Sequence, residues 1–218
     1  MRFKLAIVIG RIIRAFGSKN NRSTNLPGNI AIKICPHFFS NIKFKGKIIA
    51  VTGSNGKTTT SNMIAFMLRE AGYSVANNAE GSNLSGGIAT TLLSKCTLDG
   101  VMDYDYVVFE VDERFARIIF REFTPNIMLV TNLVRDQVVR NGHPDIIMEK
   151  LKQGIASSVQ LVLNSNDPIS SELAADNPVV YFGVEKTAYS TQNSENITQD
   201  CKVCPHCFHH LHYNFYHY

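Results

Sequence analysis

A glycine-rich segment at residues 52–60 constrains the fold of this 218-residue chain more than any other feature. It reads Thr-Gly-Ser-Asn-Gly-Lys-Thr-Thr-Thr and lies between the apolar run 48–52 and residues 57–71, whose apolar positions have helical spacing. A strand, such a loop and a helix in this order can surround a phosphate with backbone N–H groups. A turn that only starts a helix does not need Gly-Lys-Thr. The segment therefore predicts a nucleoside-triphosphate-binding α/β domain.

The residues expected to bind ATP are contiguous in this loop: Gly53, Ser54, Asn55, Gly56, Lys57, Thr58 and Thr59. Glycines permit a tight turn and close approach of the backbone to phosphate. Lys57 is the expected catalytic cation because it can reach the β- and γ-phosphates, while Thr58 can place its hydroxyl on Mg²⁺. Val51 stands where the common phosphate-loop pattern has glycine, so the segment is a variant of that pattern.

Strand and helix patterns alternate along the rest of the chain. Predicted strands cover 48–52, 74–77, 106–111, 127–131, 159–163 and 179–182, and predicted helices cover 57–71, 85–93 and 145–156. Such alternation predicts an α/β fold with a mostly parallel sheet covered on both faces. Residues 17–29 are expected to form a polar loop that ends in a Pro-Gly turn.

Polar side chains follow the predicted strands, at the edge where parallel sheets bind ligands. Glu110 ends one strand, and we expect it to hold Mg²⁺ beside Thr58 and to act in catalysis. The alternative is a surface acid at a strand end. Asn132 could bind nucleotide or substrate, although capping a turn explains it nearly as well. Asp112 and Glu113 are better explained as caps of the next helix.

The N-terminal residues have helical periodicity. One side of the predicted helix carries Leu5, Ile9, Ile12, Ile13 and Phe16, and the other carries Lys4, Arg11 and Arg14. The apolar run is too short to span a bilayer, and no small-residue cleavage site follows it. We favour a helix packed on the domain over one lying on a membrane surface. The net charge of only +4 does not favour a nucleic-acid partner.

Three of the five cysteines cluster near the end of the chain, after a polar stretch at 184–200 that we interpret as a linker. Cys204-Pro-His-Cys207 has the spacing of a zinc knuckle, for which free thiols are the alternative. A structural Zn²⁺ site needs four ligands. Cys201 and the histidines at 206, 209, 210, 212 and 217 are further candidates, but no spacing selects among them.

The loop sequence resembles the signature of the Mur ligase superfamily, which includes the folylpolyglutamate synthases. Further segments resemble its MurT family: Leu-Pro-Gly-Asn-Ile-Ala at 26–31, Asn-Ala-Glu-Gly-Ser-Asn-Leu at 78–84, Glu-Val-Asp-Glu at 110–113, Thr-Asn-Leu-Val-Arg-Asp-Gln at 131–137 and the cysteine knuckle. The resemblance implies a Mur ligase central domain with the start of a zinc-ribbon-like insertion, and ATP, Mg²⁺ and Zn²⁺ as cofactors.

The same resemblance implies an activity. MurT-like proteins activate the α-carboxylate of D-glutamate in lipid II through an acyl phosphate, and ammonia from a GatD-like glutamine amidotransferase subunit gives D-isoglutamine. The implied location is the cytoplasm, close to the membrane that carries lipid II. Another Mur-superfamily ligase of the folylpolyglutamate-synthase type, or an inactive nucleotide-binding fragment, is the alternative.

The chain also departs from the family pattern. Asp136 and Gln137 stand where ordinary Mur ligases have Asp-His. Glutamine cannot replace the imidazole as a strong metal ligand, so the metal site would depend on other groups. Lys150 or Lys152 lies where some relatives carry a carbamylated lysine, although a solvated helix lysine is the better interpretation. We expect a MurT-like protein to continue beyond Tyr218 and to supply a second cysteine pair there. The expected organisation is an N-terminal helical segment (1–44), an incomplete ATP-binding domain (45–183), and a linker with a partial zinc ribbon (184–218).

Overall fold

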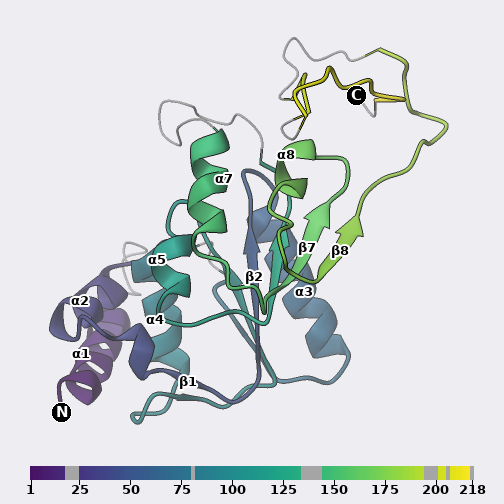
Figure 1. The fold of residues 1–218 in the computed structure, drawn as a ribbon. Coiled ribbons are helices and arrows are strands. Elements are labelled where there is room, and N and C mark those ends of the chain that lie inside the picture. Colours follow the sequence, from purple (N-terminus) through teal and green to yellow (C-terminus); the bar gives the residue numbers. More distant parts are fainter. Residues whose placement is uncertain (18–24, 80–81, 134–143, 194–200, 205–206, 217–218) are drawn as a thin grey trace.

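The structure is a computed structural model that describes residues 1–17, 25–79, 82–133, 144–193, 201–204 and 207–216 (Figure 1). Its main sheet has six parallel strands in the order β3-β5-β2-β6-β7-β8. The strands are β2 (Lys47–Thr52), β3 (Val75–Asn77), β5 (Tyr106–Glu110), β6 (Ile127–Val130), β7 (Gln160–Asn164) and β8 (Val179–Phe182). The parallel α/β fold predicted from the alternating pattern is confirmed.

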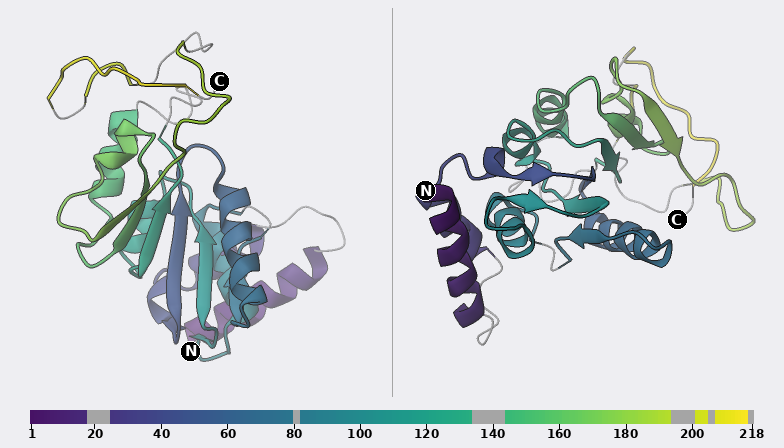
Figure 2. Two further views of the ribbon diagram at one scale, coloured as in Figure 1. Left: turned by 90° about the vertical axis from the view of Figure 1, so that its right-hand side faces the viewer. Right: turned by 90° about the horizontal axis from the view of Figure 1, so that it is seen from below.

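Helices cover both faces of this sheet (Figures 1 and 2). They are α1 (Arg2–Gly17), α2 (Leu26–Ile34), α3 (Lys57–Glu70), α4 (Ser85–Lys95), α5 (Ala116–Phe120), α7 (Pro144–Lys152) and α8 (Pro168–Ser171). A 3₁₀ turn η2 (Phe39–Asn41) leads to a separate parallel pair, β1 (Lys43–Phe44) and β4 (Val101–Met102).

The alternation of side chains along β2 divides the core into two layers. Ile48 and Ala50 belong to a large apolar cluster that includes buried residues of α4, α5 and α7. Ile49 and Val51 point the other way, where they pack with Ala65 of α3. Because both faces are covered, β2 lies in the middle of the core and its carboxyl end is a fixed point for the loop that follows.

The segment 17–29 differs from the prediction. The prediction of a polar loop is wrong for the last residues of this segment, because α2 begins at Leu26 and Pro27 lies in the first turn of that helix. Proline suits this position, since the first N–H groups of a helix have no intrahelical partner. The helix packs between α1 and α4, with Pro27, Gly28 and Ala31 buried.

The N-terminal helix packs on the domain, as the sequence predicts, but through a different face. Its buried residues are Ala6, Ile7 and Gly10, while Leu5, Ile12 and Phe16 are exposed. Arg11, expected on the solvent side, donates instead to the carbonyls of Leu93 (2.7 Å) and Cys96 at the end of α4. Small residues let the helices approach closely, and the guanidinium satisfies carbonyls that a helix end leaves unpaired.

After β8 the chain leaves the sheet as an extended segment above it (Figure 1). In the parts of this segment that are described, isolated bridges pair Thr191 with Tyr216 and Val203 with His210. Among the described helices, none has the length and apolar character needed to cross a membrane.

Candidate functional site

The glycine-rich loop joins the end of β2 to the start of α3, and its backbone requires glycine. Gly53 has φ 128° and Gly56 has φ 79°, values that L side chains rarely adopt. A Cβ atom at Gly53 would also collide with the hydroxyl of Thr131. The first N–H groups of α3 have no carbonyl partner within the helix, and the positive end of its dipole lies here. Thr58 and Thr59, in this first turn, are exposed. The loop therefore has the backbone of an anion site.

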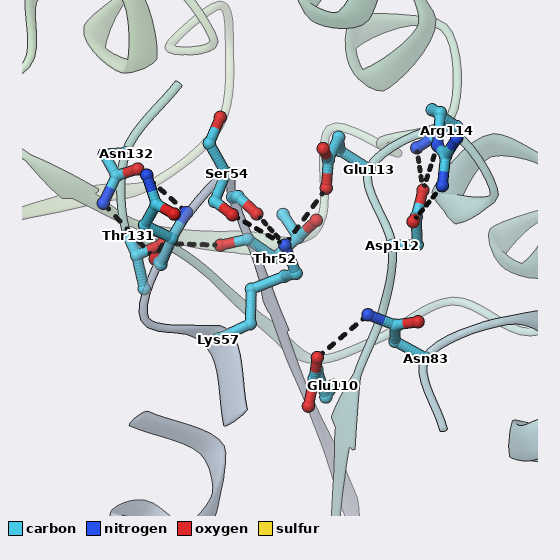
Figure 3. A network of polar contacts seen from close by, with 12 residues as sticks. Thr52, Ser54, Lys57, Asn83, Glu110, Asp112, Glu113, Arg114, Thr131 and Asn132 are labelled. Carbon is cyan, nitrogen blue, oxygen red and sulfur yellow. Dashed lines mark hydrogen bonds and ion pairs between the residues drawn. The ribbon is translucent and has the colours of Figure 1, made fainter. Parts of the chain in front are cut away.

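Lys57 lies folded over this loop (Figure 3). Its ammonium group donates to the carbonyls of Gly53 and Ser54, the latter at 3.0 Å, and lies 3.5 Å from Glu113 Oε2. The side chains are 13% exposed for Lys57 and 3% for Glu113. Glu113 therefore faces the phosphate loop, and the prediction that it caps a helix is wrong. Sequence reasoning missed this partner because 56 residues separate it from Lys57.

Glu110 is buried at the end of β5, with 2% of its surface exposed. Its Oε1 accepts a hydrogen bond from Asn83 Nδ2 (2.9 Å), and its backbone N–H and C=O both pair with the amide of Asn78 at 2.8 Å. The other oxygen, Oε2, has no hydrogen-bond partner among the described residues, and the same holds for the buried hydroxyl of Thr52. An unpaired buried carboxylate oxygen is costly unless a cation neutralises it. The Glu110 carboxylate therefore fits a Mg²⁺ ion.

Asp112 holds the turn that carries Glu113. Its carboxylate accepts from Arg114 Nε (2.8 Å), from the Arg114 Nη2 (2.6 Å) and from the Arg114 backbone N–H (3.0 Å). Burial raises the pKa of Asp112, but these hydrogen bonds and the charges of Arg114 and Lys57 outweigh it and lower the pKa below its ordinary value. Asp112 is thus an ionised residue that fixes a loop beside the site.

Asn132 and Thr131 support the phosphate loop from the end of β6. The backbone carbonyl of Asn132 accepts from Ser54 N (2.8 Å), and its side-chain amide pairs with both backbone groups of Asn55, at 3.1 and 3.3 Å. The hydroxyl of Thr131 donates to the Asn55 carbonyl (2.6 Å). Asn132 therefore holds the loop in shape; a contact of its own with nucleotide stays a prediction.

The sequence predicted four further candidates. Lys150 and Lys152 are exposed on α7, as expected for solvated lysines. Asp136 and Gln137 lie outside the described residues. Their place in the site stays a prediction.

Backbone hydrogen bonds connect the described residues on either side of the cysteine knuckle. Cys204 N donates to the His209 carbonyl (2.8 Å), and Phe208 N donates to the Cys204 carbonyl (2.9 Å). Within the residues described, no group of three or more His, Cys, Asp or Glu side chains is arranged to hold a metal ion. The predicted Zn²⁺ site at Cys201, Cys204 and Cys207 is therefore not supported by the described side chains, and no argument below uses it.

A strand, a glycine-rich loop and a helix at the centre of a parallel sheet define a phosphate-loop α/β protein. Comparison with known families makes the assignment specific. The chain belongs to the Mur ligase family, because the model of the Mur ligase middle domain matches residues 51–215.

The comparisons also confirm the resemblance to MurT. The chain is 32% identical, over all of its length, to the lipid II isoglutaminyl synthase (glutamine-hydrolyzing) subunit MurT of Staphylococcus aureus strain COL. It spans about half of that relative, 49% of its length. Among solved structures, a pseudomurein peptide ligase type C from Methanothermus fervidus has a TM-score of 0.57 at 23% identity, covering 90% of this chain and 39% of the other.

MurF from Thermotoga maritima, solved in complex with ADP, has a TM-score of 0.55 at 19% identity, covering 75% of this chain and 40% of that one. These structural similarities show a shared fold.

Proposed function

We propose that this chain is the ATP-binding part of a ligase that amidates the α-carboxylate of D-glutamate in the stem peptide of lipid II. The observation that carries the proposal is the position of Glu110 beside the phosphate loop. A buried carboxylate with an unpartnered oxygen and a lysine on a helix N-terminus lie at neighbouring strand ends. Such a pair of groups suits a metal-bound nucleoside triphosphate. The whole-chain similarity to a MurT subunit supports the choice of substrate.

In this proposal each group has a role in phosphoryl transfer. The α3 N-terminus and Lys57 hold the β- and γ-phosphates, and Lys57 exchanges its loop carbonyls for phosphate oxygens. Glu110 and Thr58 would hold Mg²⁺, which supplies charge neutralisation at the phosphates. Glu113 faces Lys57 and orients its ammonium group.

In this proposal the reaction has two steps, the formation of an acyl phosphate and its attack by ammonia. A carboxylate oxygen of D-glutamate bonds to the γ-phosphorus while the bond from that phosphorus to the β,γ-bridging oxygen breaks, which gives an acyl phosphate and ADP. Ammonia then attacks the acyl carbon, phosphate leaves, and the nitrogen loses a proton to give the amide. We propose a GatD-like glutamine amidotransferase subunit as the source of ammonia, in line with the name of the similar MurT subunit.

Nucleotide binding by the 218-residue chain is the first test. Equilibrium dialysis with ATP and Mg²⁺ should show saturable binding that Lys57→Ala weakens at least about tenfold, the loss expected for one charged hydrogen bond. Lys150→Ala removes an exposed lysine from α7 and is the matched control. Equal affinity in Lys57→Ala and the parent protein would contradict the assignment. Amidation of lipid II with a GatD-like partner, followed by mass spectrometry, then tests the substrate.

We also propose that residues 1–44, 45–183 and 184–218 are the functional segments and that the protein works in the cytoplasm, on the surface of the membrane. Exposed apolar residues follow one side of α1 at helical spacing: Leu5, Val8, Ile12 and Phe16. Arg2, Lys4 and Arg14 belong to the same helix, which has no acidic residue. An apolar stripe with cations beside it suits an anionic lipid surface.

Sedimentation with vesicles tests this location. Vesicles with about 30% phosphatidylglycerol should carry the parent protein down, and Leu5→Ser with Ile12→Ser should abolish most of that binding. Leu98→Ser, another exposed apolar residue, is the control and should bind like the parent. Equal binding of the double variant and the parent would exclude α1 as the contact.

A further inference from the structure

A side-chain amide continues the hydrogen bonding between β3 and β5 beyond the last residue of β3. The two strands are parallel, and Tyr106 N donates to the Ser74 carbonyl (3.1 Å). Parallel ladders repeat such a bond at every second residue. A continued ladder would therefore bring Glu110 N to the backbone carbonyl of Asn78. In the structure Glu110 N donates instead to the side-chain oxygen Oδ1 of Asn78 (2.8 Å).

The amide of Asn78 makes three hydrogen bonds, and two of them hold Glu110. Its Nδ2 donates to the Glu110 carbonyl (2.8 Å) and to the Ser82 carbonyl (3.0 Å), while its Oδ1 accepts from the Glu110 N–H. Both residues are buried, with 5% of Asn78 and 2% of Glu110 exposed. Buried backbone groups need partners. An asparagine amide carries donors and an acceptor in one planar group, so a single side chain here satisfies both backbone groups of Glu110.

The third bond connects Asn78 to the residue that contacts the Glu110 carboxylate. Ser82, whose carbonyl accepts from Asn78, directly precedes Asn83. Asn83 Nδ2 donates to Glu110 Oε1 at 2.9 Å (Figure 3). The backbone carbonyl of Asn83 accepts from Asp112 N (3.0 Å). Asn78 therefore fixes the backbone of Glu110 directly, and its bond to Ser82 fixes the residue next to the one that holds the carboxylate.

We propose that Asn78 is a positioning residue, which holds Glu110 where its carboxylate can bind Mg²⁺. The inference rests on the metal role of Glu110 in the proposed function. Side chains that orient a metal ligand from behind contribute to affinity, and losing one typically weakens metal binding by about tenfold or more. A ligand that is already held at its backbone and at its carboxylate also loses less conformational freedom when the ion binds.

Nuclear magnetic resonance tests the central hydrogen bond in the metal-free parent protein. The bond from Glu110 N–H to Asn78 Oδ1 should give a scalar coupling between the Glu110 amide nitrogen and the Asn78 Cγ. The bond from Tyr106 N to the Ser74 carbonyl, in the same pair of strands, is the control for detection. A visible control coupling without the coupling to Asn78 would overturn the inference.

A Mg²⁺ titration of ATP binding tests the positioning role. Asn78→Ala should raise the Mg²⁺ concentration for half-maximal ATP binding by about tenfold. ATP binding in EDTA should change by less than about twofold, because the phosphate loop keeps its own contacts. Asn78→Leu removes the same hydrogen bonds and nearly keeps the volume of the side chain. A shift shared by both variants therefore comes from the lost bonds and not from a cavity, and a thermal melt checks that each variant folds.

The neighbouring asparagine is the matched control. Asn77 Oδ1 accepts from Arg69 (2.6 Å) and its Nδ2 donates to Asn62 (2.9 Å), so its amide holds α3 and not Glu110. Asn77→Ala should lower the melting temperature and leave the Mg²⁺ titration unchanged. A shift as large in Asn77→Ala as in Asn78→Ala would show a general effect of destabilisation and would overturn the inference.

The Glu110→Gln background separates this inference from the proposed function. If Asn78 acts through Glu110, Asn78→Ala should change the Mg²⁺ requirement of Glu110→Gln by less than about twofold. Equal shifts in both backgrounds would overturn the positioning role. An unchanged Mg²⁺ requirement in Glu110→Gln alone would refute the metal role of Glu110 and the inference with it. A shift in Glu110→Gln without one in Asn78→Ala would refute the positioning role alone.

Discussion

Replacing Glu113 by glutamine tests whether the ion pair at the phosphate loop is formed in the free protein. The substitution keeps the size of the side chain and removes its charge. Lys57 then keeps the carbonyls of Gly53 and Ser54 but faces no counter-charge among the described residues. Glu113→Gln should therefore destabilise the nucleotide-free protein, because a largely buried ammonium group loses its counter-charge.

The size of this effect follows from the distance and the burial. The two charged groups lie 3.5 Å apart, with side-chain exposures of 13% and 3%. Two unit charges about 4 Å apart attract by about 4 kcal/mol at an effective dielectric constant of about 20. The two loop carbonyls still accept from Lys57, and each such bond contributes about 1 kcal/mol. We therefore expect Glu113→Gln to lower the free energy of unfolding by about 2–3 kcal/mol, less than the roughly 3–5 kcal/mol typical of a fully buried broken pair.

Urea unfolding without nucleotide or metal measures this difference. A double-mutant cycle with Lys57→Met isolates the pair, and its coupling energy should be about 2 kcal/mol. Glu70→Gln, an exposed acid at the end of the same helix α3, is the control and should change stability by less than about 0.5 kcal/mol. A coupling energy near zero would show that Lys57 and Glu113 do not interact in solution, and the proposed orientation of Lys57 would be wrong.

Two further substitutions test neighbouring groups. Glu110→Gln should keep the fold, because the glutamine amide oxygen can still accept from Asn83. It should raise the Mg²⁺ concentration for half-maximal ATP binding by about tenfold or more, as expected when a metal site loses a charged ligand. An unchanged Mg²⁺ titration would remove Glu110 from the metal site. Asp112→Asn should cost about 1–2 kcal/mol at neutral pH. Because the pKa of Asp112 is lowered in the folded protein, this stabilisation is present above the unfolded value of about 3.9 and is lost as the pH falls through the folded pKa. The stability curves of variant and parent should therefore converge in acid, and a constant difference across the pH range would contradict the Arg114 contact.

The main strands and helices of the fold could be predicted from the sequence, because their sequence signals are local. Apolar runs gave β2, β5 and β6 within a residue or two of their observed ends, and the glycine-rich loop placed the start of α3. The short helix α5 and the pair of β1 with β4 escaped prediction, since five- and two-residue elements carry too little periodicity. The helix α2 also escaped prediction, because a Pro-Gly pair is typical of a turn while proline equally suits the first position of a helix.

The site was predictable only in part, for a related reason. Lys57 and Glu110 are marked by a motif and by a strand end. In contrast, the roles of Glu113, Asn78 and Asn83 depend on which strands are neighbours, and this is a property of the folded sheet. Nothing in the local sequence around Glu113 distinguishes an acid that caps a helix from one that reaches a lysine 56 positions earlier.

The strand order explains why these residues meet. In the order β3-β5-β2-β6, strands that follow β2 in sequence lie on both sides of it. The carboxyl ends of β5, β2 and β6 therefore present Glu110, the phosphate loop and Asn132 in adjacent positions. Each strand end contributes a different part of this arrangement. The end of β6 fixes the loop backbone, β2 leads to helix α3, and β5 is followed by the acids Glu110 and Glu113. The direction of winding therefore reverses at β2, and the strand ends at such a reversal are where open parallel sheets bind ligands.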